Sequence, residues 1–110
     1  MQKQYRLKRR AAFNYVYRKG EKDASQHLVL LYAKSREGLK IGLSVSKKVG
    51  NSVIRNRVKR LLRAGLLPIQ DGIDAKYMYV IVAKPNASEM SYSDCCAELE
   101  SVFKRAGKLC

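Results

Sequence analysis

The sequence predicts an α/β (α+β) two-layer sandwich in which a small mixed central β-sheet carries about three helices, in the order α-β-β-α-β-α. Three segments have the residue pattern of strands, three have the 3.6-residue period of amphipathic helices, and the two kinds are interspersed along 110 residues. No linker or low-complexity stretch divides residues 1–110, and 46% of them are hydrophobic. We therefore expect a single domain with one modest core.

The first helix is predicted over residues 9–19. Phe13, Val16 and Tyr17 fall on one side of it, and Gly20 follows as a stop signal. An aromatic pair four residues apart is ordinarily core packing, so the residues alone favour a packing role for Phe13 and Tyr17.

Three strands are predicted around the second helix. Residues 28–33 are apolar at every position, which indicates a central, largely buried strand. After a turn at Glu37 and Gly38, residues 39–46 alternate strictly, and their second face carries Lys40, Gly42, Ser44 and Ser46. This pattern predicts a strand with one face of small or polar side chains. Residues 77–83, flanked by turn residues, form the third strand.

The second helix begins near Asn51 and is strongly basic. At 100° per residue its apolar side chains gather on one side, and its cations form a line four residues apart, Arg55, Lys59 and Arg63, beside Asn56 and Arg60. We assign Val53, Val58 and Leu61 to packing. Asn51 or Ser52 can cap the helix, and Lys47 and Lys48 lie just before it. Like charges four residues apart repel, so an anionic partner best explains the line.

The last helix is predicted over residues 92–106. Its apolar members, which include Cys95, Leu99 and Phe103, lie on one side. Four of the nine acids lie on this helix or just before it: Glu89, Asp94, Glu98 and Glu100. We therefore expect its outer face to point away from a nucleic acid.

The charge of the chain is concentrated in two segments. The formal net charge is +14, yet residues 1–20 and 38–70 hold fifteen of the 23 cations and no acid. Such asymmetry is typical of nucleic-acid binding, whereas a solvated basic face would be the ordinary interpretation of one helix alone. A membrane surface is the competing polyanion, but the sequence has no long apolar run, signal-peptide core or lipidation motif.

The residue types that carry hydrolytic chemistry are scarce. Cys95, Cys96 and Cys110 have no metal-ligand spacing, and reduced thiols in the cytoplasm are their simplest interpretation, with their role left open. His27 has no second histidine and is interpreted as structural. No paired-carboxylate constellation is visible, so we expect no catalytic residue and no all-protein metal site.

Residues 42–60, GLSVSKKVGNSVIRNRVKR, closely resemble the signature of the bacterial ribonuclease P protein subunit, and the Arg55-Asn56-Arg57 core is highly distinctive. The resemblance extends from Phe13 through the residue 28–32 strand to the last helix. It implies a ribonucleoprotein endonuclease that removes the 5′ leader from precursor tRNA, in which the RNA subunit performs the chemistry. The protein would be a cytoplasmic monomer that assists substrate binding and metal affinity, with Mg²⁺ held mainly by RNA phosphates. A left-handed βαβ crossover is also implied.

The resemblance further implies two sets of site residues. The RNA-binding set is Lys47, Lys48, Asn51, Arg55, Asn56, Arg57, Lys59, Arg60 and Arg63. The set for a leader-binding cleft between the first helix and the sheet is Phe13, Tyr17, Tyr32, Ser44 and Ser46. Arg57 lies at the margin of the apolar helix face, so it either contacts RNA or orders a loop. Because Ala64 and Gly65 depart from the family pattern, we expect the basic helix to end early.

Two other functions share some of these features. A ribosomal or other structural RNA-binding protein would have the same size and charge without a catalytic partner. A protein-only nuclease would use Asp71, Asp74 and magnesium, but two acids in a predicted turn favour it only weakly.

Overall fold

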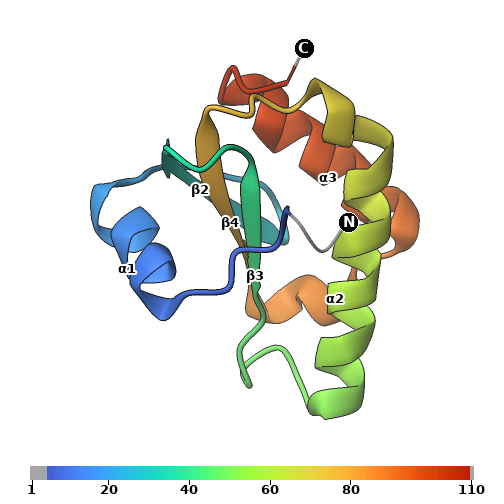
Figure 1. The fold of residues 1–110 in the computed structure, drawn as a ribbon. Coiled ribbons are helices and arrows are strands. Elements are labelled where there is room, and N and C mark those ends of the chain that lie inside the picture. The colour runs from blue at the N-terminus through green and yellow to red at the C-terminus, as the bar shows by residue number, and fades with distance from the viewer. Residues whose placement is uncertain (1–4, 110) are drawn as a thin grey trace.

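A four-stranded mixed sheet with helices on both of its faces forms the fold (Figure 1). The structure is a computed structural model and describes residues 5–109. Its elements in chain order are α1 Arg10–Lys19, β1 Glu21–Ala24, β2 Leu28–Lys34, β3 Lys40–Ser44, α2 Ser52–Leu66, η2 Leu67–Gly72, β4 Tyr77–Ala83, η3 Pro85–Glu89 and α3 Tyr92–Arg105. The predicted α+β class, with three α-helices and a mixed sheet, is confirmed.

The strand order in the sheet is β1-β2-β4-β3. Strand β2 is antiparallel to both of its neighbours, whereas β3 and β4 are parallel and are connected through α2. The prediction that residues 28–33 form a central strand is confirmed. Strand β1 was not predicted, because Glu21-Lys22-Asp23-Ala24 has no apolar alternation.

Most of the core lies between the sheet and the α2 and α3 helices (Figure 1). Val58 and Leu62 of α2 and Leu99 and Phe103 of α3 are fully buried there. A smaller cluster on the opposite face joins Val16 of α1 to sheet residues Leu31, Ala33 and Val80. One face of the sheet is therefore sealed by two helices, and the other is covered only in part by one short helix.

Two predictions about the basic helix are wrong. The helix does not end early, because it runs to Leu66 and continues into η2. Gly65 lies against α3 so closely that an added Cβ would sit 2.9 Å from Leu99 Cδ1, and this packing holds the last turn. Val53 does not pack either: its side chain is 73% exposed, because it lies on the same side of the helix as Asn56 and Arg60.

Helix α3 is fastened to the hairpin of β1 and β2 by Glu98. Its carboxylate accepts a hydrogen bond from the Ser25 hydroxyl at 2.5 Å and another from the His27 N–H at 2.7 Å. Its second oxygen lies 2.5 Å from His27 Nδ1. His27 is buried, as its interpretation as a structural residue requires. Glu98 thus faces inward and does not belong to the outer acidic face that we expected from the sequence.

The outer edge of β3 is partly paired with the segment before α1. Arg6 forms a parallel bridge with Ile41, and the Leu7 N–H donates to the Ile41 carbonyl at 3.0 Å. The opposite edge of the sheet is the charged strand β1. Residues near the start of the chain thereby reach the strand that leads into α2.

Candidate nucleic-acid interface

The basic helix is capped as the sequence predicts. Asn51 has extended backbone angles, and its side-chain oxygen accepts a hydrogen bond from the Ile54 N–H at 3.0 Å. Lys47 and Lys48 are exposed just before the cap, next to the exposed Ser46. The positive end of the helix dipole and two ammonium groups therefore lie together in solvent, an arrangement that favours a phosphate.

The cations of α2 form one surface, defined here as the basic face: Arg55, Asn56, Lys59, Arg60 and Arg63. Asn56 and Arg60 are exposed, whereas the other three are half-buried along the helix flank. Among residues 5–109 the ion pairs are His27–Glu98, Lys104–Glu100 and Arg105–Asp23, so no carboxylate there neutralises this face. The buried Nε atoms of Arg55 and Arg63 also lack a protein acceptor. Unpaired donors of this kind suit an external oxygen ligand.

Arg57 makes the contacts that its loop-ordering alternative requires. Its two terminal nitrogens donate to the carbonyls of Ser88 and Met90 at 3.2 and 3.3 Å. These bonds connect α2 to η3 and to the residues that precede α3. The guanidinium group is thereby tied to the protein, unlike that of Arg60.

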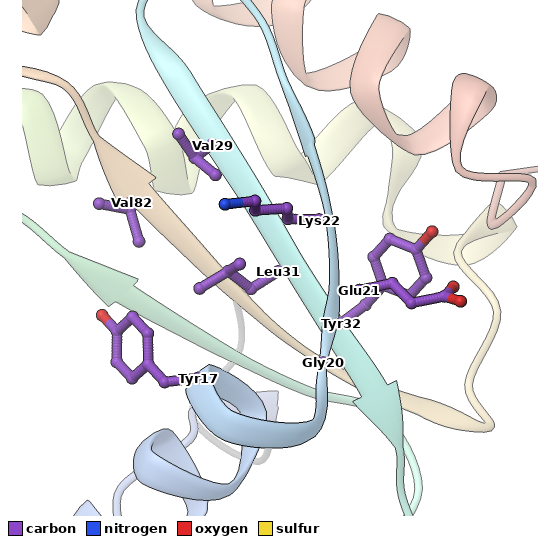
Figure 2. Close-up of a pocket in the computed structure, with 8 residues that line it drawn as sticks. All are labelled: Tyr17, Gly20, Glu21, Lys22, Val29, Leu31, Tyr32 and Val82. Atoms are coloured by element: carbon purple, nitrogen blue, oxygen red, sulfur yellow. The ribbon is translucent and has the colours of Figure 1, made fainter.

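A broad open cleft of about 840 Å³ lies between the end of α1 and the sheet (Figure 2). Figure 2 shows Tyr17 extending from α1 toward Leu31, with Val29 and Val82 on the sheet and Lys22 on the far side. The Tyr17 side chain is 47% exposed. An exposed aromatic ring above an aliphatic floor is a surface on which an unpaired base can stack.

Phe13 does not line this cleft but lies between the smaller core and the basic face. A Cβ placed on Gly42 would lie 2.5 Å from Phe13 Cζ, so the ring lies directly against the backbone of β3. Phe13 is half-buried and packs on the smaller core. It also lines a small hollow of about 130 Å³ together with Lys59 and Arg63 of α2. The half-buried Ser44 follows Gly42 by two residues on the same face of β3.

Tyr32 is among the residues that line this cleft, as predicted, but its ring does not point into it. Its ring belongs to the large core on the other face of the sheet, 6.1 Å from the Tyr77 ring centroid and 5.4 Å from Lys108 Nζ. Figure 2 shows it pointing away from Tyr17. Burial, and then Glu21, raise the pKa of Tyr32. Successive side chains of a strand alternate between faces, so Leu31 takes the position in the cleft.

The side chains that could hold a metal ion or act as nucleophiles lie apart or buried in the described part of the chain. No three His, Cys, Asp or Glu side chains within residues 5–109 come together in a way that could hold a metal ion. The Asp74 carboxylate instead accepts a hydrogen bond from the Lys76 N–H at 2.9 Å. Burial raises the pKa of Cys95 to about 12, so this thiol is not a nucleophile near neutral pH.

No helix in the described part of the chain combines the length and the apolar character needed to cross a bilayer.

Comparison with known proteins gives one consistent result. The model of the family described as Ribonuclease P matches residues 1–107. A "Ribonuclease P protein component" of Bacillus cereus is 39% identical over 109 residues, which cover 97% of this chain and 95% of the relative. One from Bacillus anthracis is also 39% identical, with coverage of 97% and 92%.

Solved structures of similar fold carry the same description. The Staphylococcus aureus RNase P protein superposes with a TM-score of 0.88 at 32% identity, covering 96% of this chain and 98% of that one. The RNase P protein from Thermotoga maritima has a TM-score of 0.81 at 23% identity, with coverage of 91% and 96%. At that identity the second likeness concerns the fold alone.

Proposed function

Because this chain belongs to the ribonuclease P protein family and is a subunit of the RNase P ribonucleoprotein, we propose that it assists a catalytic RNA in removing the 5′ leader from precursor tRNA. The RNA subunit performs the endonucleolytic cleavage. The protein binds that RNA, holds the leader and raises the affinity for substrate and metal. The absence of a metal-ligand cluster from residues 5–109 supports this division of roles.

The basic face carries the contact with the catalytic RNA. Its side chains, extended by Lys47, Lys48 and Asn51, contact phosphates and release the counterions condensed on them. Arg57 supports this surface through its bonds to Ser88 and Met90. The observation that carries the proposal is that no carboxylate within residues 5–109 pairs with any of these cations.

The cleft beside α1 holds the single-stranded leader. Tyr17 stacks on an unpaired base, and Phe13, Ser44 and Ser46 continue the surface toward α2. Stacking contributes on the order of 1–3 kcal/mol per base and tolerates any base, which suits leaders of varied sequence. Leu31, in place of Tyr32, supplies the floor. A contact upstream of the scissile bond distinguishes precursor from mature tRNA.

Mg²⁺ acts through the RNA in this proposal. The phosphates of the ribozyme and substrate hold the ions, and Asn56 offers at most an amide oxygen to an ion or to its water shell. A protein that holds these phosphates close together raises their affinity for Mg²⁺, because more phosphate oxygens then surround each ion. We further propose that the protein is a cytoplasmic monomer until it meets its RNA.

Reconstitution tests the proposal. With a cognate catalytic RNA at low magnesium concentration, the protein should restore removal of the leader, because it supplies the positive charge that magnesium otherwise provides. A ribosomal or other structural RNA-binding protein would bind RNA without any such stimulation. Failure to stimulate cleavage would therefore favour that alternative.

The salt dependence of binding tests the basic face. Arg60→Ala should weaken binding to the catalytic RNA and lower the log-log salt slope by roughly 0.7 to 0.9, the value of one phosphate contact. Lys104→Ala is the matched control, because Lys104 is an exposed cation on α3 that pairs with Glu100. An unchanged slope for Arg60→Ala would contradict the phosphate contact.

Comparison of precursor and mature tRNA tests the cleft. Tyr17→Ala should weaken binding of the precursor and leave that of mature tRNA unchanged. Tyr92→Ala is the control, because Tyr92 is also exposed (49%) but lies at the start of α3. Equal losses for both tRNA forms would assign Tyr17 a packing role.

A further inference from the structure

The cleft beside Tyr17 is called the leader cleft below. A second groove lies on the other side of α1 from it. Tyr15 and Tyr17 are two residues apart on this helix and therefore project in nearly opposite directions, and both are exposed. Tyr15 lines a groove of about 1120 Å³, larger than the leader cleft. We call it the distal groove, and its principal lining residues are Arg9, Tyr15, Lys34, Arg36, Lys76 and Tyr77.

The distal groove has a basic rim. Its four cations, Arg9, Lys34, Arg36 and Lys76, are exposed, and none of them forms an ion pair within residues 5–109. Two carboxylates, Glu37 and Asp74, also line it, so the rim is positive by two charges.

The rim surrounds a floor that includes Tyr15 and Met78. Tyr77 also lines the groove, but its ring packs on the large core, where Lys108 Nζ lies 3.8 Å from the ring centroid. Cations beside exposed rings are the combination that binds unpaired nucleotides, through phosphates and bases respectively.

A third hollow on the outer surface of α1 shares one lining residue with each groove. It has a volume of about 510 Å³ and is lined by Ala11, Asn14, Tyr17 and Arg18. Tyr17 also lines the leader cleft, and Ala11 also lines the distal groove. The two residues are about 9 Å apart along the helix axis, from the rise of 1.5 Å per residue. One strand can therefore leave the first groove, cross α1 beside Arg18 and enter the second.

We propose that the distal groove binds the 5′-distal nucleotides of long leaders, with a base stacked on Tyr15 and phosphates on Lys34 and Arg36. This inference rests on the proposed function, since the strand must first occupy the leader cleft. Each lost stack or phosphate contact should then matter only for leaders long enough to cross α1. The chain would bind long leaders more tightly than short ones.

The test uses the reconstituted holoenzyme with two precursor tRNAs, whose leaders of about 5 and about 15 nucleotides lie near the two ends of the usual range of single-strand site lengths. Tyr15→Ala and the double variant Lys34→Ala/Arg36→Ala should weaken binding of the long-leader precursor by roughly 5- to 100-fold. Binding of the short-leader precursor should not change. Tyr15→Phe should keep the long-leader affinity, because stacking needs the ring and not the hydroxyl. Tyr92→Ala is the matched control.

Several results would overturn the inference. Equal losses of affinity for the two precursors, or no loss for the long-leader precursor, would show that the leader does not bind in the distal groove. Weaker binding of the catalytic RNA alone, without dependence on leader length, would assign the groove to that RNA instead. Cleavage of the short-leader precursor by the wild-type holoenzyme tests the proposed function separately. If the short-leader precursor is not cleaved, both the proposed function and this inference are rejected. If it is cleaved but the variants do not weaken long-leader binding, only this inference is rejected.

Discussion

The two faces of the sheet are built for different purposes. The face under α2 and α3 is closed: Leu62, Leu99 and Phe103 are fully buried against it. The face under α1 has a smaller core around Val16, and its cleft stays open beside Tyr17. One sheet therefore carries the basic helix on its closed side and an accessible cleft on its open side. The difference predicts that stability and the proposed leader binding can be changed separately.

The largest expected effect separates the two cores. Leu99→Ala should lower the free energy of unfolding by about 2–5 kcal/mol, because it leaves a cavity in the closed core. Leu31→Ala should cost only about 2 kcal/mol, because water from the cleft can enter and only the transfer cost of the lost carbons remains. Urea unfolding of both variants measures the difference.

The two variants should rank in the opposite order in their affinity for precursor tRNA. Leu31→Ala should weaken precursor binding through the lost cleft floor, whereas a folded Leu99→Ala protein should bind normally. Equal stability losses with equal binding losses would contradict the separation of the two faces.

Gly42→Ala should disturb the open face by displacing Phe13. The added methyl group would lie 2.5 Å from the ring and 3.2 Å from Leu7 Cβ. Overpacking of this kind costs about 1–3 kcal/mol, measured by chemical unfolding, and the displaced ring should also reduce leader affinity. In a double-mutant cycle, Phe13→Ala should cost less in the Gly42→Ala background than in the wild type. Additive losses would mean that the ring does not lie where the structure places it.

Glu98→Gln tests the fastening of α3 to the β1–β2 hairpin. Burial alone would raise the pKa of Glu98, but the hydrogen bonds from Ser25 and His27 outweigh it and lower the pKa. A lowered pKa stabilises the fold above the ordinary carboxyl value of about 4.3, and this contribution disappears as the pH falls through the lowered value.

The variant should therefore be less stable by about 1–2 kcal/mol at pH 7, and the gap should narrow on acidification below pH 4. Unfolding curves of both proteins over this pH range give the measurement. A gap independent of pH would contradict the charged hydrogen-bond arrangement.

The smallest effect compares two arginines of one helix. Arg57→Ala should cost about 0.5–1.5 kcal/mol of stability, because it removes the bonds to Ser88 and Met90. Arg60→Ala should stay within about 0.5 kcal/mol, since Arg60 is exposed. Thermal unfolding and RNA titration of both variants should give opposite rankings, with Arg60 the more important for RNA. The same ranking in both assays would show that Arg57 is not primarily a loop anchor.

The local features of the fold could be predicted from the sequence. The cap at Asn51, the turn at Gly38 and the β4 strand at residues 77–83 follow from short-range patterns, and the structure confirms each one. The basic face follows in the same way, because helical spacing alone decides which side chains share a side. These features depend only on neighbouring residues.

Other features depend on partners that are distant in sequence. Residues 28–33 are apolar throughout, so they lack the alternation that would show whether Leu31 or Tyr32 faces the cleft. The contact between His27 and Glu98 spans 71 positions. The distal groove combines cations from three parts of the chain. Only the packed structure brings such residues together.

The pairing of Arg6 and Leu7 with Ile41 has a consequence for the behaviour of the protein before assembly. An uncovered outer strand offers unsatisfied amides and carbonyls to any similar strand, which is the usual route to aggregation. Here residues 6 and 7 occupy part of that position on β3, and the charges of β1 discourage the same reaction at the other end. Both outer edges of the sheet are thus less open to pairing with a strand of another chain.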